Sequence, residues 1–213
     1  MRRTITVLCA LLLLMPMVWA EPVSLEEINA YAKLQYKSQW KNAALSIRSV
    51  LPQDEQGGYT YSTTIAFPNR KAAEVCRLMA ERLSAAVELD TIEADDTTPY
   101  LFRARTYVYS AASQVGGFYR FHLCLHPLIT VQALDDEARL TVSLQYYEIV
   151  KTDKGIVSSI FNRGEGRPLP AEQWLLSDRF PYNERGKMPL ATAEAFTKSY
   201  ALIQLLIRRI SAQ

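Results

Sequence analysis

Three residues that bind soft metals alternate along one short stretch of the sequence. His122, Cys124 and His126 are two positions apart, so a β-strand would place all three on the same face. Imidazole and thiolate are both zinc and copper ligands. The spacing matches no usual zinc signature, however, and all the ligands would come from one strand. We therefore predict neither a metal site nor a bound cofactor.

Four cationic side chains form a second candidate site on the same stretch and the strand before it. They are Arg103, Arg105, Arg120 and His122. If the two strands pair as a hairpin around Gly116-Gly117, these side chains lie opposite or diagonal to one another. Clustered cations bind carboxylates or phosphates. The alternative is a solvated outer sheet face, balanced by the acidic loop at residues 93–96.

The N-terminus has the pattern of an export signal. Arg2 and Arg3 precede an uncharged apolar stretch from Ile5 to Val18, and a small residue, Ala20, stands before Glu21. About 14 apolar residues are too few for a helix that crosses a bilayer, which needs about 20. We predict that residues 1–20 are cleaved and that the mature chain is periplasmic or secreted, with no transmembrane segment after the signal is removed.

Removal of the signal makes the chain electrically neutral. Loss of Arg2 and Arg3 lowers the number of basic residues from 24 to 22, which equals the 22 acidic residues. A neutral chain has no overall field that attracts nucleic acid, so we expect no nucleic-acid partner. Residues 21–213 have the length of a single domain.

Two cysteines, Cys76 and Cys124, remain after cleavage. An even pair in an exported chain predicts a disulfide. Closing a loop of about 48 residues would stabilise the fold by about 4 kcal/mol. The alternative is two separate buried thiols.

Hydrophobic periodicity predicts both helices and strands. The expected helices are 24–40, which begins with a capping box, then 70–86 and 191–211; the expected strands are 59–67, 100–110, 118–125, 128–134 and 139–151. The 100–110 strand has one polar-aromatic face. The predicted fold class is α+β: a curved antiparallel sheet of about five strands, with an N-terminal helix, a helix after the first strand and a long C-terminal helix packed mainly on one face.

A long irregular segment separates the last predicted strand from the C-terminal helix. Residues 152–189 are rich in Gly, Pro and charge, with at most a short helix near Ala171–Leu176. The segment also carries large apolar side chains, which a solvated linker would not need. We predict that these contact a partner; they include Phe161, Trp174, Phe180 and Tyr182. The alternative is that they pack on the domain itself and pin the loop.

Three functions fit these features. The first is an exported envelope protein that binds a protein partner without chemistry, as an accessory subunit, an inhibitor or an immunity protein; the 12 tyrosines favour it because tyrosine is enriched at interfaces. The second is a carrier of a small amphipathic or anionic ligand held between the sheet and the C-terminal helix. The third is a hydrolase that uses His122, His126 and scattered Ser or Asp residues. The chain has no recognisable catalytic motif, so an enzyme is the least favoured.

Overall fold

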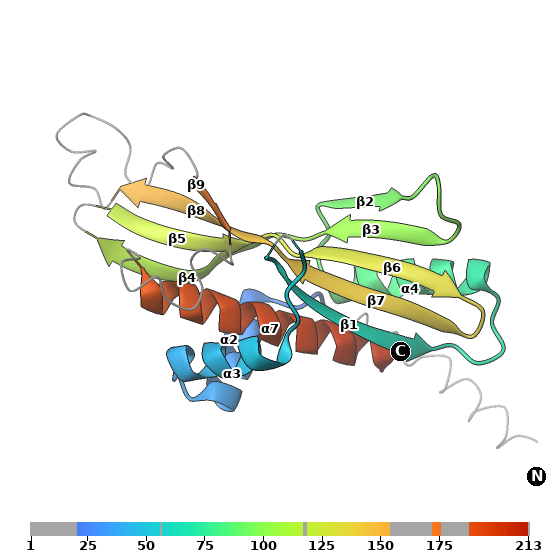
Figure 1. The fold of residues 1–213 in the computed structure, drawn as a ribbon, viewed down its shortest axis with the longest axis horizontal. Coiled ribbons are helices and arrows are strands. Elements are labelled where there is room, and N and C mark those ends of the chain that lie inside the picture. The colour runs from blue at the N-terminus through green and yellow to red at the C-terminus, as the bar shows by residue number, and fades with distance from the viewer. Residues whose placement is uncertain (1–20, 56, 117–118, 154–171, 176–187, 213) are drawn as a thin grey trace, which may run out of the picture.

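The computed structural model describes residues 21–55, 57–116, 119–153, 172–175 and 188–212. Within these ranges the chain forms four helices and nine strands, which Figure 1 shows in their arrangement. The helices are α2 (Leu25–Tyr36), α3 (Trp40–Val50), α4 (Ala72–Ala86) and α7 (Pro189–Ser211). The strands are β1 (Tyr59–Ala66), β2 (Thr91–Ala94), β3 (Leu101–Arg105), β4 (Val108–Gly116), β5 (Tyr119–Leu125), β6 (Leu128–Leu134), β7 (Glu137–Leu144), β8 (Tyr146–Asp153) and β9 (Glu172–Leu175).

The strands form two antiparallel sheets, and three segments of the chain pass from one sheet into the other. One sheet has the order β1-β7-β6-β3-β2 and the other has the order β4-β5-β8-β9. The pairs β3/β4, β5/β6 and β7/β8 are consecutive in the sequence, and each pair contributes one strand to each sheet. Three continuous segments therefore run through the whole molecule and bend where one sheet passes into the other (Figure 1).

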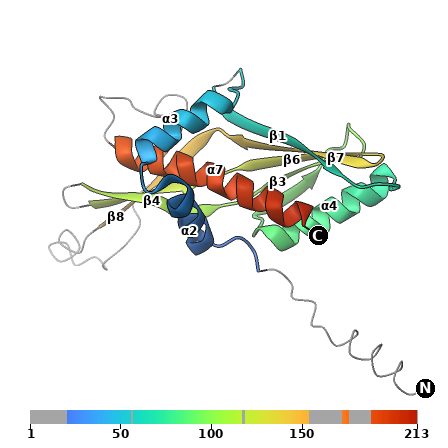
Figure 2. The ribbon, with the colours of Figure 1, turned by 90° about the horizontal axis from the view of Figure 1, so that it is seen from below.

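The helices cover one face of the sheets (Figure 2). Helix α4 packs on β6 and β7, while α7 packs on β4 and β5 and also contacts α2, α3 and α4. The buried face of α7 includes Phe196, whose ring meets that of Tyr59 edge to face with centroids 4.8 Å apart. Two polar contacts fix the register of α7: the Tyr147 hydroxyl donates to the Thr192 carbonyl at 3.0 Å, and Lys198 Nζ donates to the Ala111 carbonyl at 2.6 Å.

The α+β class, the antiparallel sheet and the long C-terminal helix are confirmed. The predicted bounds of three elements differ from those in the structure, in each case where the chain changes direction. The expected helix 24–40 ends at Tyr36, because Lys37 and Ser38 adopt left-handed conformations with φ of 48° and 59° before α3 begins. The expected strand 100–110 divides at Thr106, whose hydroxyl donates to the Glu88 carbonyl, and the expected strand 139–151 divides at Gln145.

The predicted Cys76–Cys124 disulfide is not formed, and both residues are free thiols. Cys76 lies half-buried on α4, which packs on the five-stranded sheet, whereas Cys124 is buried on β5 of the four-stranded sheet. The division of the strands between two sheets therefore separates two positions that a single curved sheet would have brought together.

None of the helices within the described ranges combines the length and the apolar character that crossing a bilayer requires.

The packing of α7 predicts a large difference between two apolar truncations. Phe196→Ala empties a fully buried site and should lower the free energy of unfolding by about 3–5 kcal/mol. Leu34→Ala removes a side chain that is 75% exposed and should change it by less than about 0.5 kcal/mol. Urea denaturation of the two variants measures both values, and equal losses would contradict this role for α7.

Candidate functional site

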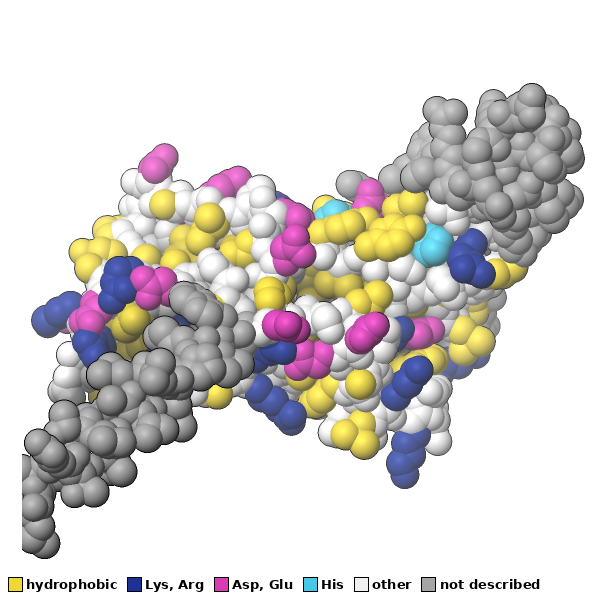
Figure 3. Space-filling view, turned by 180° about the vertical axis from the view of Figure 1, so that it is seen from behind, with side chains coloured by type: hydrophobic (Ala, Val, Ile, Leu, Met, Phe, Trp, Pro, Cys, Tyr) yellow, Lys and Arg dark blue, Asp and Glu magenta, His cyan; other side chains and the backbone are white. Residues whose placement is uncertain are grey.

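The outer face of the four-stranded sheet carries an unusual set of side chains. Along β5 and β8, Leu123, Leu125, Tyr147 and Ile149 point into the core. The alternate positions therefore point to the other side of the sheet. We call the set on that side the histidine–tyrosine face; its members are Tyr107, Tyr109, Ser110, His122, His126, Tyr146, Glu148 and Thr152. Figure 3 shows both histidines (cyan) on either side of a hydrophobic patch.

His126 occupies the point where the three shared segments bend. Its ring lies between Tyr107, with centroids 4.8 Å apart, and Tyr146, with centroids 5.3 Å apart in a stacked arrangement. Its Nε2 lies 3.0 Å from Oε2 of Glu148. Each of the three rings comes from a different segment, because Tyr107 precedes β4, His126 follows β5 and Tyr146 begins β8. The bend itself therefore assembles this half of the face.

His122 forms the second half of the face. Nδ1 shares a hydrogen bond with Ser110 Oγ at 2.8 Å, and Nε2 shares one with Thr152 Oγ1 at 3.1 Å. The ring also stacks on Tyr109, with centroids 5.2 Å apart. Burial, and then the positive charge of Arg120, lower the pKa of His122 below its usual 6.5, so the ring favours its neutral form.

A β-bulge positions Ser110. The register between β4 and β5 shifts between Val108 and Ala112, and Ser110 has a φ of 54°. A left-handed conformation is unfavourable for serine, and such residues often occur at functional positions. The bulge directs the Ser110 hydroxyl to His122 and its backbone N–H to the sulfur of Cys124 at 3.4 Å.

Two further titratable side chains at the face, Cys124 and Tyr107, are held in their neutral forms. Burial raises the pKa of the Cys124 thiol, which keeps it protonated and unreactive. Burial also raises the pKa of Tyr107, with further contributions from the neighbouring Cys124 and Glu148. The face therefore presents aromatic rings and hydroxyls, with Glu148 against His126 and the exposed Arg120 two positions before His122 on β5.

The alternating residues His122, Cys124 and His126 do not form a ligand cluster in the described part of the chain. Among the described residues, no three His, Cys, Asp or Glu side chains come close enough together to hold a metal ion. His122 and His126 face the same side of the sheet as expected, but both ring nitrogens of His122 are bonded to Ser110 and Thr152, and Nε2 of His126 is bonded to Glu148.

The predicted cationic patch is not assembled. Arg103 and Arg105 lie on β3 in one sheet, while Arg120 and His122 lie on β5 in the other. The turn near residue 116 joins β5 to β4 and not to β3, so Ser113 pairs with His122. The exposed side chain of Arg103 instead forms an ion pair with Asp95 at 2.9 Å, as expected of a solvated sheet face.

Of the predicted partner-binding residues, only Trp174 lies in the described part of the chain. It belongs to β9, where its backbone pairs with Tyr147, so residues 172–175 form a strand and not the short helix that the sequence predicts. Phe161, Phe180 and Tyr182 lie outside the described residues and stay predictions.

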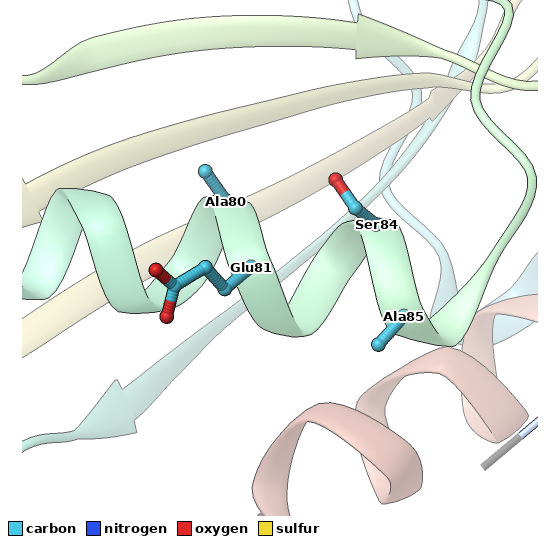
Figure 4. Close-up of a pocket in the computed structure, with 4 residues that line it drawn as sticks. All are labelled: Ala80, Glu81, Ser84 and Ala85. Carbon is cyan, nitrogen blue, oxygen red and sulfur yellow. The ribbon is translucent and has the colours of Figure 1, made fainter. Parts of the chain in front are cut away.

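Cavities offer a separate kind of site. One hollow of about 460 Å³ lies on the outer side of α4 and is lined by Ala80, Glu81, Ser84 and Ala85 (Figure 4). Its walls come from a single helix and carry one charged group, so it offers few convergent contacts to a ligand.

Comparison with known proteins identifies no family. No family model matches the chain, and no curated protein does. Two solved structures are similar in fold. A TBP-like protein from Parabacteroides distasonis aligns with a TM-score of 0.44 and 11% identity, over 75% of this chain and 96% of that chain. A DUF4468 family protein from Bacteroides ovatus aligns with a TM-score of 0.42 and 14% identity, over 76% and 91%.

The lowered pKa of His122 predicts a pH-dependent stability. The unfolded chain takes up a proton near pH 6.5, but the folded chain does so only at lower pH, so the free energy of unfolding should fall as the pH drops below about 6.5. Urea denaturation at pH 7.5 and pH 5 measures this loss, which should be smaller in His122→Asn. An NMR titration that gives His122 a pKa of 6.5 or above would contradict it.

Proposed function

We propose that the protein is exported and binds a protein partner through the histidine–tyrosine face. The observation that carries this proposal is the locked set of tyrosines on that face. Tyr109 is 46% exposed, and its ring is stacked on His122, whose two nitrogens are already bonded. A rigid ring with a polar end loses little conformational entropy on binding, and such rings dominate many protein interfaces.

The composition of the face favours a protein over a polyanion or a membrane. The exposed residues Tyr109 and Val115 are both uncharged and lie on the edge strand β4. Arg120, opposite Val115 on β5, adds an exposed positive charge, but Arg103 and Arg105 lie in the other sheet and do not join it. Glu148 is only 22% exposed and is paired with His126, so it does not repel a partner strongly. An accessory, inhibitory or immunity role would each use such a surface.

A ligand carrier receives less support. A carrier would need space between α7 and the sheets, but the α7 residues in this layer are closely packed. Phe196, Leu202 and Ile203 have no exposed surface, which means that no water-sized space adjoins them in the described part of the chain. A ligand bound there would have to displace core side chains.

A hydrolase has one observation in its favour, the 2.8 Å contact between Ser110 Oγ and His122 Nδ1. A serine nucleophile next to a histidine base is the usual arrangement for acyl transfer. Here, however, the group behind the histidine is the Thr152 hydroxyl and not a carboxylate. The Ser110 N–H is also bonded to the sulfur of Cys124, so it does not face a developing oxyanion.

Two tyrosines allow a matched test of partner binding. Tyr109 and Tyr100 are 46% and 48% exposed, but Tyr100 precedes β3, in the five-stranded sheet. A photoreactive benzophenone amino acid at position 109 should give a discrete cross-linked adduct in the cells that make the protein, and position 100 should not. Once the partner is identified from that adduct, Tyr109→Ala should weaken its affinity at least tenfold and Tyr100→Ala should not. Equal cross-linking at both positions would contradict the proposed face.

Reactivity of Ser110 separates a binding protein from a hydrolase. We expect intact-mass spectrometry to show no covalent adduct on this protein after incubation with a fluorophosphonate. A known serine hydrolase, incubated in the same way, is the positive control and should be labelled. The reason is that Ser110 lacks both a carboxylate-supported base and a free oxyanion donor. An adduct that Ser110→Ala abolishes would instead support the hydrolase.

A further inference from the structure

A second pocket adjoins the histidine–tyrosine face. It has a volume of about 330 Å³ and lies between the start of α2, the end of α4 and the β3–β4 junction. Its lining residues are Val23, Ser24, Leu25, Ile28, Val87, Glu88, Thr106, Tyr107, Val108 and Tyr109. The volume is at the lower end of the range of about 300–1,000 Å³ for small-molecule pockets.

Hydrogen bonds between its walls make the pocket a fixed part of the fold. The Val23 N–H donates to the Ala86 carbonyl at 2.8 Å, which holds the chain before α2 against the end of α4. The Thr106 hydroxyl donates to the Glu88 carbonyl at 2.7 Å, which holds the third wall. The pocket is therefore present before any ligand arrives, and binding in it requires little reorganisation.

The pocket is apolar inside and acidic at its rim. Ile28, Val87 and Val108 are at most 9% exposed and form apolar walls. Glu88 lines the pocket, and Glu26 follows the lining residue Leu25 in the first turn of α2; both are exposed and form no ion pair with any described residue. An apolar group next to a positive charge would complement both features.

Strand β4, an edge strand of the four-stranded sheet, begins at this pocket. Strand β3 pairs with β2 up to the pair Thr91–Arg105, where β3 ends. The chain then continues into β4, which has β5 as its single strand neighbour in the described sheet. No residue of β4 is charged. Uncharged edge strands are sites where an extended peptide adds to a sheet, with its side chains entering adjacent pockets.

We propose that this pocket receives an apolar side chain from an extended segment of a partner protein, and that a neighbouring Lys or Arg of the segment faces Glu88 and Glu26. Tyr107 and Tyr109 belong both to the pocket and to the histidine–tyrosine face, so one partner can contact the two together. This inference rests on the proposed function and adds the chemistry of the partner to it.

Short peptides test the pocket directly on the mature full-length chain. The probe is the acetylated peptide Lys-Thr-Phe-Thr-Lys, titrated into ¹⁵N-labelled protein. Backbone NMR shifts should change in residues 23–28, 87–88 and 106–109. Replacing Phe by Ala in the peptide should weaken binding at least tenfold because the apolar anchor is lost, and replacing both lysines by glutamates should weaken it further. No shifts at millimolar peptide, or equal binding of the Phe and Ala peptides, would overturn the proposal.

A pair of charge reversals provides the matched control. Glu88→Lys should weaken binding of the Lys-Thr-Phe-Thr-Lys peptide, whereas Glu93→Lys, on β2 outside the pocket, should leave it unchanged. If a partner cross-links at Tyr109 but is insensitive to Glu88→Lys, the pocket inference fails and the proposed function stands. If the peptide binds in the pocket but no partner cross-links at Tyr109, the proposed function fails instead. Sedimentation also shows whether the protein self-associates. If self-association prevents the peptide from binding, a second copy of the chain occupies the pocket, and the inference is overturned.

Discussion

The bend shared by three chain segments is the constraint on which the rest of the structure depends. Each segment leaves one sheet and enters the other within one or two residues: Thr106-Tyr107, His126-Pro127 and Gln145. Pro127 cannot donate a backbone hydrogen bond, which favours an interruption of the sheet at that point. Because the segments are neighbours in both sheets, their bends lie side by side. The rings of Tyr107, His126 and Tyr146 meet there as a direct consequence.

Helix α7 holds the four-stranded sheet in the shape that the face requires. Lys198 is 6% exposed, is paired with Glu194 at 2.6 Å and donates to the Ala111 carbonyl. A buried ammonium is tolerated only with such partners. Ala111 follows Ser110 in the bulge. The hydrogen bond from Lys198 holds the bulge on the core side of the sheet, and the hydrogen bond between Ser110 and His122 holds it on the outer side. The core and the face are therefore coupled through a single strand.

The hydrophobic periodicity of the sequence predicted most helices and strands correctly. The predicted cationic site was wrong because it depended on which strands pair, and periodicity does not determine that. Alternation identified β1, β5 and β6, and a stripe of apolar residues identified α4 and α7. The same alternation continues without interruption through the bend at Thr106, because both sheets bury their apolar residues on one side. Nothing in the pattern marks the change of sheet, and the arginine patch and the disulfide were both inferred as though one sheet held all these residues.

The polar-aromatic side of residues 100–110 was visible in the sequence, but its partners were not. Tyr107 and Tyr109 alternate with buried residues, yet their ring contacts lie 19 and 13 positions further along the chain, in His126 and His122, and Tyr146 stacks on His126 from another 20 positions on. Only the register of β4, β5 and β8 brings these residues together. The register also provides support for the proposed recognition role over chemistry, because both nitrogens of His122 and one of His126 are already bonded to neighbours within the face. Histidines held in this way act as flat supports that orient tyrosines, and an oriented tyrosine is the element that a binding surface needs.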